Sequence, residues 1–229
     1  MKILLEDDSL IAVYKEAGLP SQTASLAGKD LVSEVKNYLA GIQGIKMPYL
    51  ALINRLDQPV EGIVLFAKNE KSAAALSRQL QSGEMKKHYQ ALIYGHMPDD
   101  EGQLTDYMYK DAKGNCSKIV KPTQAGAKKA ELRYQVAAST ELQQLLNIEL
   151  LTGRHHQIRL QLSSRNCPLI GDLKYGTPES VAYSKQQGIR QIGLCACSLS
   201  FLHPVNHKVT ALEIESENPL IQKIIGGIV

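Results

Sequence analysis

Residues 49–68 read YLALINRLDQPVEGIVLFAK, and this stretch contains two apolar runs, 49–53 and 63–67, on either side of a polar turn. Short apolar runs bounded by Pro and Gly predict two β-strands joined by a loop of defined shape. The loop presents the carboxylate of Asp57 two residues after the guanidinium of Arg55. The pattern is typical either of a functional acid at a strand junction or of a surface turn in which Arg55 and Asp57 pair.

Similar apolar runs recur along the chain and outnumber the helix-like stretches. Further strands are expected at residues 2–5, 10–14, 89–94, 132–137, 146–151, 192–201 and 209–214. Helices are expected at residues 30–39, at 69–81 with Asn69 as the N-cap and Gly83 just beyond the end, near 155–163, and from Pro219. Because helices do not alternate regularly with strands, the pattern favours an α+β fold on a large mixed, mainly antiparallel sheet with flanking helices.

The sequence contains no repeat, low-complexity tract or linker-like stretch. We therefore expect residues 1–229 to form one continuous domain, which can consist of two lobes. Two segments resemble surface excursions from that domain. Residues 106–120 carry the turn chemistry of a hairpin tip, and residues 173–189 form a polar connection that contains Gly and Pro.

Positive charge is concentrated in the middle of the chain. The formal net charge is only +3, but residues 105–133 carry seven basic and three acidic side chains, and residues 154–165 carry three arginines and no acid. Such a distribution is expected of a groove that binds a polyanion, and it is also compatible with a solvated, lysine-rich hairpin.

Other features of the composition exclude several classes of protein. The first residues do not resemble a signal peptide, and no apolar run approaches the length of a membrane span, so we expect a cytoplasmic protein. The four cysteines lack the paired spacing of a zinc site and are expected to be reduced structural thiols. No metal site is expected.

A second polar cluster lies at residues 151–162, LTGRHHQIRLQL. We expect Thr152 to cap a helix whose first turns carry Arg154 and His155, with Arg159 one turn after His155. A helix start with an arginine and exposed amides is a ready site for a phosphate or a carboxylate. Adjacent histidines point to different helix faces and no partner carboxylate accompanies them, which disfavours a metal.

A third cluster, residues 86–95 (KKHYQALIYG), begins with the basic pair Lys86 and Lys87 and enters an alternating strand at Tyr89. A tyrosine in this position is ordinarily a half-buried residue of a sheet. Alone, the cluster therefore indicates a strand rather than a site.

Taken together, these clusters resemble the RluA-type RNA pseudouridine synthases. The motifs of that family stand in their usual order as RLD at 55–57, KHYQA at 87–91, TGRHHQIR at 152–159, GDLKYG at 171–176 and LSFLHP at 199–204. Agreement between several weak motifs in register is much stronger than any one of them. The chain departs from the family at Asn54, where His is usual, at Val60 and Glu61, where Thr and Ser are common, and at Glu16, where Pro often follows the lysine.

The resemblance implies an isomerase that converts specific uridines of structured RNA to pseudouridine without a cofactor. It assigns to Asp57 the carboxylate that acts beside the sugar, by attack at C1′, by stabilising positive charge there or by taking a proton from C2′. Tyr89 corresponds to the residue that stacks on the base and helps to remove the C5 proton. Arg154 corresponds to the basic partner that keeps the aspartate ionised.

A stacked uridine must be flipped out of the RNA to reach such a site. We expect Arg55 to fill the vacated stack or to grip the RNA backbone. Phosphate contacts are expected from Lys86, Lys87 and Arg159, and from a basic hairpin at 110–118 through Lys110 and Lys118.

The expected partner is ribosomal or transfer RNA. We expect the protein to bind it as a monomer, with no membrane involved and no separate N-terminal RNA-binding domain. Two alternatives stay open. One is a catalytically silent RNA-binding protein, and the other is a carboxylate-based hydrolase of sugars or nucleosides, for which Glu61 would have to be the second acid.

Overall fold

The computed structural model describes residues 1–23, 28–44, 46–111 and 114–227. The chain divides into two compact units, and each is described by itself. Unit 1 contains Met1–Lys86 and Ala196–Glu215, and unit 2 contains Lys87–Cys195 and Ser216–Val229.

Unit 1 is built on strands that neighbour one another in the order β1 (Lys2–Glu6), β2 (Leu10–Lys15), β4 (Glu61–Ala67) and β10 (Leu194–Leu202). Strand β11 (Val209–Glu213) pairs with β10, and the short β3 (Ala51–Leu52) pairs with the end of β4. The β1–β2 and β2–β4 pairs are antiparallel. The strands expected on both sides of Asp57 are therefore confirmed as β3 and β4.

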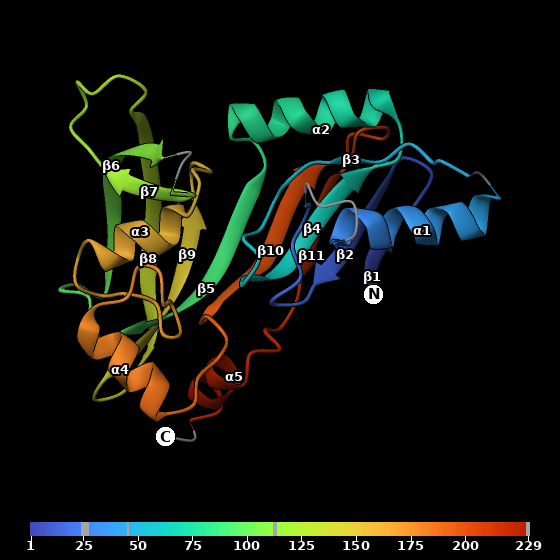
Figure 1. Cartoon of the computed structure of the whole chain (residues 1–229). Helices are drawn as coiled ribbons and strands as arrows, with labels where there is room; N and C mark the ends of the chain where they lie inside the picture. The colour runs from blue at the N-terminus through green and yellow to red at the C-terminus, as the bar shows by residue number, and fades with distance from the viewer. Residues whose placement is uncertain (24–27, 45, 112–113, 228–229) are drawn as a thin grey trace. The chain divides into compact units, whose positions relative to one another are not determined.

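Two helices, α1 (Leu31–Gln43) and α2 (Glu70–Ser82), accompany these strands, as Figure 1 shows. Both helices begin where the sequence predicts, because a side-chain acceptor stands at each N-cap. Asp30 accepts from the amide of Ser33, and Asn69 accepts from the amide of Ser72. Gly83 ends α2 in the left-handed conformation, as expected.

The core of unit 1 gathers apolar side chains of β2, β4, α2 and β10. Every residue of β2 and β4 is buried, so both faces of these strands are covered. On one face Leu65 packs with Leu76 of α2 and Phe201 of β10. The continuous apolar runs of these strands are explained by this burial on both faces.

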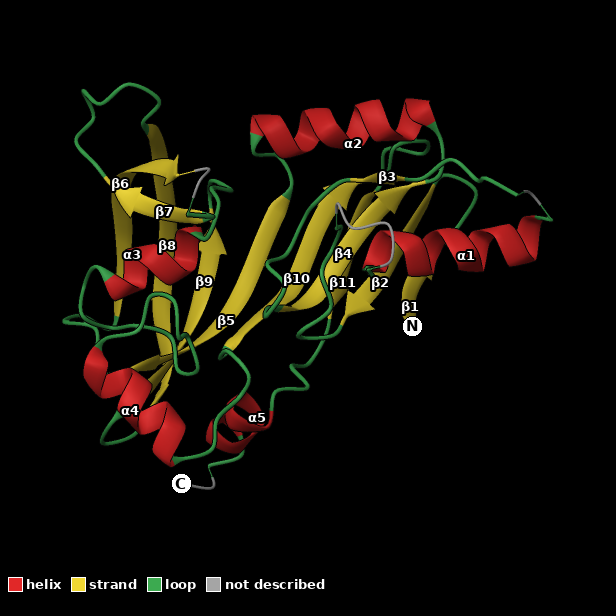
Figure 2. Ribbon diagram, in the orientation of Figure 1, coloured by secondary structure: helices red, strands yellow, loops and turns green. Residues whose placement is uncertain are grey.

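Unit 2 contains a second set of strands in the order β5 (Lys86–Tyr94), β9 (Gln143–Leu150), β8 (Lys128–Ser139), β6 (Glu101–Asp111) and β7 (Cys116–Ile119). All four of these neighbouring pairs are antiparallel. Helices α3 (Gln157–Ser163), α4 (Pro178–Gln186) and α5 (Pro219–Ile225) belong to the same unit. Figure 2 shows these strands and helices in separate colours, and the expected α+β fold with a mainly antiparallel sheet is confirmed.

Two expectations in unit 2 were wrong. Residues 173–189 are not merely a polar connection, because α4 forms within them. Thr177 caps this helix by accepting from the amide of Ser180, and Pro178 occupies its first turn. The second error is the start of α3, which begins at Gln157 and leaves Arg154 and His155 in the preceding loop.

The basic excursion at 106–120 is confirmed as a hairpin of β6 and β7. Its expected tip includes Ala112 and Lys113, which lie outside the described residues. In the part of the chain that the structure describes, no helix is long and apolar enough to cross a membrane. All four cysteines are free thiols, and burial raises the pKa of Cys197 to about 11.

Candidate active site

The Asp57 loop, residues 54–60, is held at both ends by main-chain contacts of unit 1. Ser21 donates its hydroxyl to the carbonyl of Leu56 at 2.8 Å and accepts from the Leu56 amide at 3.1 Å. The amide of Val60 donates to the carbonyl of Asp57 at 3.0 Å, which closes a turn directly after the acid. The half-buried Asp57 therefore extends from a backbone that is fixed before and after it.

Asn54, which stands where the family usually has His, anchors the loop to β4. Its amide group donates to the carbonyl of Ile63 at 3.0 Å and accepts from the amide of Leu65 at 2.8 Å. An asparagine can satisfy both main-chain groups because it carries a donor and an acceptor side by side. Arg55 is exposed to solvent on the same loop.

Lys15 supports the loop from the end of β2. Its side chain is fully buried, and the ammonium donates to the carbonyls of Glu16 at 3.0 Å, Leu19 at 2.7 Å and Gln58 at 3.1 Å. The Gln58 carbonyl also accepts from the amide of Gly18 at 2.8 Å. Three carbonyls satisfy all three donors of an ammonium, so the lysine joins residues 16–19 to the Asp57 loop.

Burial lowers the pKa of Lys15 to about 8, although the negative charges of Asp57 and Glu61 oppose this shift. Lys15 is therefore a positive charge close to the Asp57 carboxylate. Glu61 is only 1% exposed and accepts from the hydroxyl of Tyr14 at 2.8 Å. Sequence reasoning missed Lys15, Tyr14 and Glu61 as a buried polar cluster beneath the loop.

Gly62 follows this cluster and is required by the close approach of β10. It has φ of 132°, and a Cβ there would lie 2.4 Å from the carbonyl oxygen of Ala196. Another residue would push these two strands apart and move the end of the Asp57 loop.

Strand β5, which begins at Lys86 of unit 1 and continues through unit 2, directs the adjacent Lys86 and Lys87 to opposite faces. Lys87 and Tyr89 are 9% and 8% exposed, whereas Lys86 and His88 are exposed. Because side chains of a strand alternate between faces, Lys87 and Tyr89 share one face and Lys86 and His88 share the other. Lys86 is accessible to RNA, but the burial of Lys87 differs from the expected surface contact.

The Arg154 loop, residues 151–156, precedes α3 and is held by Gln157. The Gln157 side-chain oxygen accepts from the amide of Arg154 at 2.9 Å and from the hydroxyl of Thr152 at 2.8 Å. Thr152 also accepts from the amide of Glu131 at 2.8 Å, so it joins the loop to β8 instead of capping α3. The expected helix start that carries Arg154 does not form, because α3 begins only after His156, which is left-handed with φ of 55°.

Arg154 is half-buried and donates its Nε to the carbonyl of Lys129 at 2.8 Å. The positive charge of Arg154 affects the pKa of Lys87. Burial, and after it the positive charge of Arg154, lowers the pKa of the Lys87 ammonium. The structure thus brings Lys87, Tyr89 and the Arg154 loop into one part of unit 2.

Two histidines and a tyrosine connect the Arg154 loop to the basic hairpin. The rings of His155 and His156 stack with centroids 3.7 Å apart. Ser117 of β7 lies 3.0 Å from Nδ1 of His155, and the hydroxyl of Tyr175 lies 2.8 Å from Nδ1 of His156. The amide of Ser117 donates to that same tyrosine hydroxyl at 2.8 Å, so the hairpin and the loop share one hydrogen-bond network.

Arg159 was expected to contact a phosphate, and this expectation was wrong. Its guanidinium is 6% exposed and donates to Asp172 from Nε at 2.7 Å and from Nη2 at 2.8 Å. The same guanidinium lies 5.2 Å from the centre of the Tyr175 ring. A buried arginine paired at two points is a structural element and is not available to RNA.

Lys110 and Lys118 of the β6–β7 hairpin are exposed, as a nucleic-acid contact requires. Lys118 lies 3.7 Å from Asp111, a distance at which an exposed pair contributes little. Lys174 donates to the carbonyl of Asn115 at 2.8 Å and thereby ties the hairpin to residues after α3.

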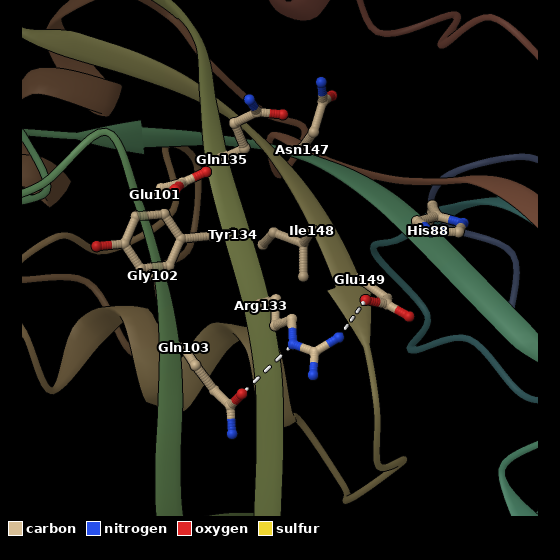
Figure 3. A pocket seen from close by; sticks show the side chains of 10 residues that line it. All are labelled: His88, Glu101, Gly102, Gln103, Arg133, Tyr134, Gln135, Asn147, Ile148 and Glu149. Atoms are coloured by element: carbon tan, nitrogen blue, oxygen red, sulfur yellow. Dashed lines mark hydrogen bonds and ion pairs between the residues drawn. The ribbon is translucent and has the colours of Figure 1, made fainter.

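A hollow lies on a face of the unit 2 strands, as Figure 3 shows. Arg133 crosses this face, with Nε 3.4 Å from the side-chain oxygen of Gln103 and Nη1 3.3 Å from Glu149. His88 lies at its edge, on the opposite face from Tyr89. Ile148, the cross-strand neighbour of Tyr89, also lines the hollow. Among the residues that the structure describes, no group of three or more His, Cys, Asp or Glu side chains is placed to hold a metal.

Comparisons with known proteins agree with the motifs. The model of the RNA pseudouridylate synthase family matches residues 9–164. The dual-specificity RNA pseudouridine synthase RluA of Vibrio vulnificus is 30% identical over 217 residues, which cover 92% of this chain and 81% of that protein. The ribosomal large subunit pseudouridine synthase C of Rickettsia felis is 32% identical over 206 residues, 89% of this chain and 65% of that protein.

The fold is also found among solved structures. Human RNA pseudouridylate synthase domain containing 4 superposes with a TM-score of 0.78 at 22% identity, over 99% of this chain and 92% of that one. The expected pseudouridine synthase fold and the resemblance to the RluA-type enzymes are both confirmed. The chain belongs to the RNA pseudouridylate synthase family, whose members isomerise uridine in RNA to pseudouridine.

Proposed function

We propose that this enzyme modifies specific uridines of structured ribosomal or transfer RNA through the carboxylate of Asp57. The observation that carries the proposal is the support of the Asp57 loop: the main chain is fixed on both sides of the acid by Ser21, Lys15 and the turn to Val60. A carboxylate that must act on one sugar carbon needs such a fixed backbone.

In this mechanism the uridine is flipped out of the RNA and its N1–C1′ bond breaks. Asp57 stabilises positive charge at C1′, attacks it, or takes a proton from C2′, while the uracil turns and presents C5. The positive charge of Lys15 close to Asp57 stabilises the ionised acid in any of these routes. The resemblance gives Tyr89 the stacking on the base and a part in removing the C5 proton, and it gives Arg154 the role of the family's basic partner.

Recognition of the RNA is assigned to exposed basic groups. Arg55, Lys86, Lys110 and Lys118 are all accessible, and they would contact phosphates and the vacated stack. Relatives named as ribosomal large subunit enzymes support ribosomal RNA, and a relative named a dual-specificity RNA pseudouridine synthase supports more than one RNA target. We propose that the enzyme acts as a monomer in the cytoplasm, where these RNAs are found.

The first prediction is that Asp57→Asn folds and binds RNA but makes no pseudouridine. The change is nearly isosteric, and the loop contacts at Leu56, Gln58 and Val60 involve main-chain groups that remain. An amide neither stabilises a cationic carbon well nor accepts a proton at neutral pH. The measurement is tritium release from RNA labelled at uracil C5, together with a filter-binding titration and a circular dichroism spectrum.

The matched control is Asp8→Asn, an exposed carboxylate of the same unit, which should retain full tritium release. Release by Asp57→Asn at the wild-type rate would refute the assignment of the acid. A wild-type protein that binds RNA and releases no tritium would instead support the catalytically silent RNA-binding protein. Release of free uracil would favour a hydrolase.

A further inference from the structure

The edge strand β7 of the basic hairpin is held on its outer side by the side chain of Tyr175. Strand β7 is the last in the order of the sheet and pairs with β6. An edge strand presents main-chain amides on the side that faces no other strand. The amide of Ser117 donates to the hydroxyl of Tyr175 at 2.8 Å, and Ser117 is 4% exposed. A tyrosine hydroxyl therefore takes the place of a neighbouring strand at this point of the hairpin.

Tyr175 is itself fixed to α3 and to Asp172. Its amide donates to Asp172 at 3.1 Å, and its carbonyl accepts from the hydroxyl of Ser163 at 2.5 Å. Its ring centre lies 5.2 Å from the guanidinium of Arg159. Burial raises the pKa of Tyr175, so its hydroxyl stays protonated at neutral pH. The main chain and the ring thus fix the residue, while the hydroxyl reaches the hairpin.

The same hydroxyl also meets the Arg154 loop. It lies 2.8 Å from Nδ1 of His156, whereas the hydroxyl of Ser117 donates to the carbonyl of His155 at 2.8 Å. The hairpin is therefore docked beside this loop at neighbouring points. The bond between Ser117 and His155 does not involve Tyr175, so it remains when the tyrosine hydroxyl is removed.

The docked hairpin carries two of the cations that the proposed function assigns to RNA. Lys110 lies opposite Ser117 in the β6–β7 ladder, and Lys118 follows Ser117 directly. Both lysines are exposed. A contact to a phosphate is stronger when the cation is already held in place, because ordering a segment on binding costs free energy. The docking of β7 therefore affects how tightly these lysines bind.

We propose that Tyr175 is a positioning residue for RNA binding, whose hydroxyl docks β7 beside the Arg154 loop so that Lys110 and Lys118 meet the RNA from a fixed place. The inference rests on the proposed function, which assigns these lysines to phosphates. RNA selects the docked hairpin, so its affinity falls with the fraction of molecules in which the hairpin is docked.

The test is Tyr175→Phe, studied by RNA filter binding at several salt concentrations and by the kinetics of tritium release. Phenylalanine keeps the ring over Arg159 and the main-chain bonds, and it lacks only the hydroxyl. We expect the RNA affinity to fall roughly tenfold, which is the scale of one or two hydrogen bonds. The slope of log affinity against log salt should become shallower. KM should rise by a larger factor than kcat falls, because the change removes binding.

A combined variant shows whether Tyr175 acts through the lysines. Lys110→Gln together with Lys118→Gln should reduce the salt slope by about two units, one for each phosphate contact. Adding Tyr175→Phe to this pair should then change the affinity by less than about twofold, because its effect depends on the same contacts. Tyr183→Phe is the control, since Tyr183 is a half-buried tyrosine of the same unit whose hydroxyl accepts from Gln143 at 2.5 Å. It should keep the wild-type affinity and slope.

Three results would overturn the proposal. The first is wild-type affinity in Tyr175→Phe, and the second is a loss that adds fully to that of the lysine pair. The third is an equal fall in kcat and kcat/KM with an unchanged salt slope, which would give Tyr175 a role in the reaction site instead. Amide exchange of the wild-type protein tests the docking without any variant. The Ser117 amide should be protected, and exchange at the rate of an unstructured peptide would contradict the docking.

These results are separate from a failure of the proposed function. Binding can be measured in the Asp57→Asn background, where no turnover is needed. If Asp57→Asn stays active, the assignment of the acid fails while the effect of Tyr175→Phe on affinity stands. If the lysine pair variant keeps the wild-type salt slope, the role of Tyr175 fails while Asp57→Asn still tests the chemistry.

Discussion

The Asp57 loop and the Arg154 loop are held in place by different kinds of contact. The main chain of the Asp57 loop is bonded at Leu56, Asp57 and Gln58, to the Ser21 hydroxyl, the Val60 amide and the Lys15 ammonium. The Arg154 loop also has main-chain bonds, from the amides of Leu151 and Thr152 to the carbonyl of Glu131. In addition it depends on side chains that bond to one another, such as Thr152 with Gln157 and His156 with Tyr175.

The difference indicates how many side chains of each loop can be substituted without moving its main chain. Contacts to main-chain groups tolerate changes in most of the loop side chains, with the exception of Asn54, whose side chain bonds to β4. Contacts between side chains change whenever a partner changes. The Arg154 loop is also connected to the basic hairpin through Ser117, so a change in either segment affects the other.

The largest expected effect is a loss of stability when the buried Arg159–Asp172 pair beside the Arg154 loop is broken. Asp172→Ala removes both acceptors of the buried Arg159 and the acceptor of the Tyr175 amide. Removal of one partner from a buried ion pair costs about 3–5 kcal/mol. Urea unfolding and amide exchange should show this loss, with faster exchange in unit 2.

Asp111→Ala is the control for this change, because its pair with Lys118 is exposed and 3.7 Å long. It should alter the free energy of unfolding by less than about 1 kcal/mol. Equal losses in the two variants would contradict the distinction between a buried framework and a surface pair.

An intermediate effect is expected at Lys15, which supports the Asp57 loop. Its pKa is about 8 in the folded protein and returns to its ordinary value of 10.5 on unfolding. Between these pH values the unfolded chain holds a proton that the folded protein has lost, so stability rises with pH. The full shift corresponds to a gain of about 3 kcal/mol, and below pH 8 the contribution is constant.

The measurement is the difference in the free energy of unfolding between the wild-type protein and Lys15→Met at pH 7.5, 9 and 10. Subtracting the variant removes the titration of other lysines and tyrosines. A difference that stays flat or falls over this range would contradict the burial of an ammonium at Lys15.

The smallest expected effect concerns the exposed Lys86. Loss of one phosphate contact should reduce the slope of log affinity against log salt by about one unit. Lys86→Gln should therefore bind RNA with a shallower salt dependence. An unchanged slope would place Lys86 outside the RNA interface and would sharpen its contrast with Lys87.

The sequence by itself determined the features that depend on local chemistry. The apolar runs on both sides of Asp57 predict β3 and β4, because two buried faces require continuous apolar residues. Asn69 and Gly83 mark the ends of α2, because Asn69 satisfies an orphan main-chain amide and glycine readily adopts the left-handed conformation that ends a helix. The ordered motifs likewise predicted the family, which the comparisons confirm.

Only the tertiary structure decided which charged side chains are buried and what they meet. Arg159 was expected to contact RNA, but Asp172, which lies beyond the end of its helix, binds it in the interior. Lys86 and Lys87 look equivalent in sequence and are separated by the alternation of β5, while Lys15 acquires its three acceptors from residues up to Gln58. Burial and pairing depend on neighbours that are distant in sequence, and no local pattern contains that information.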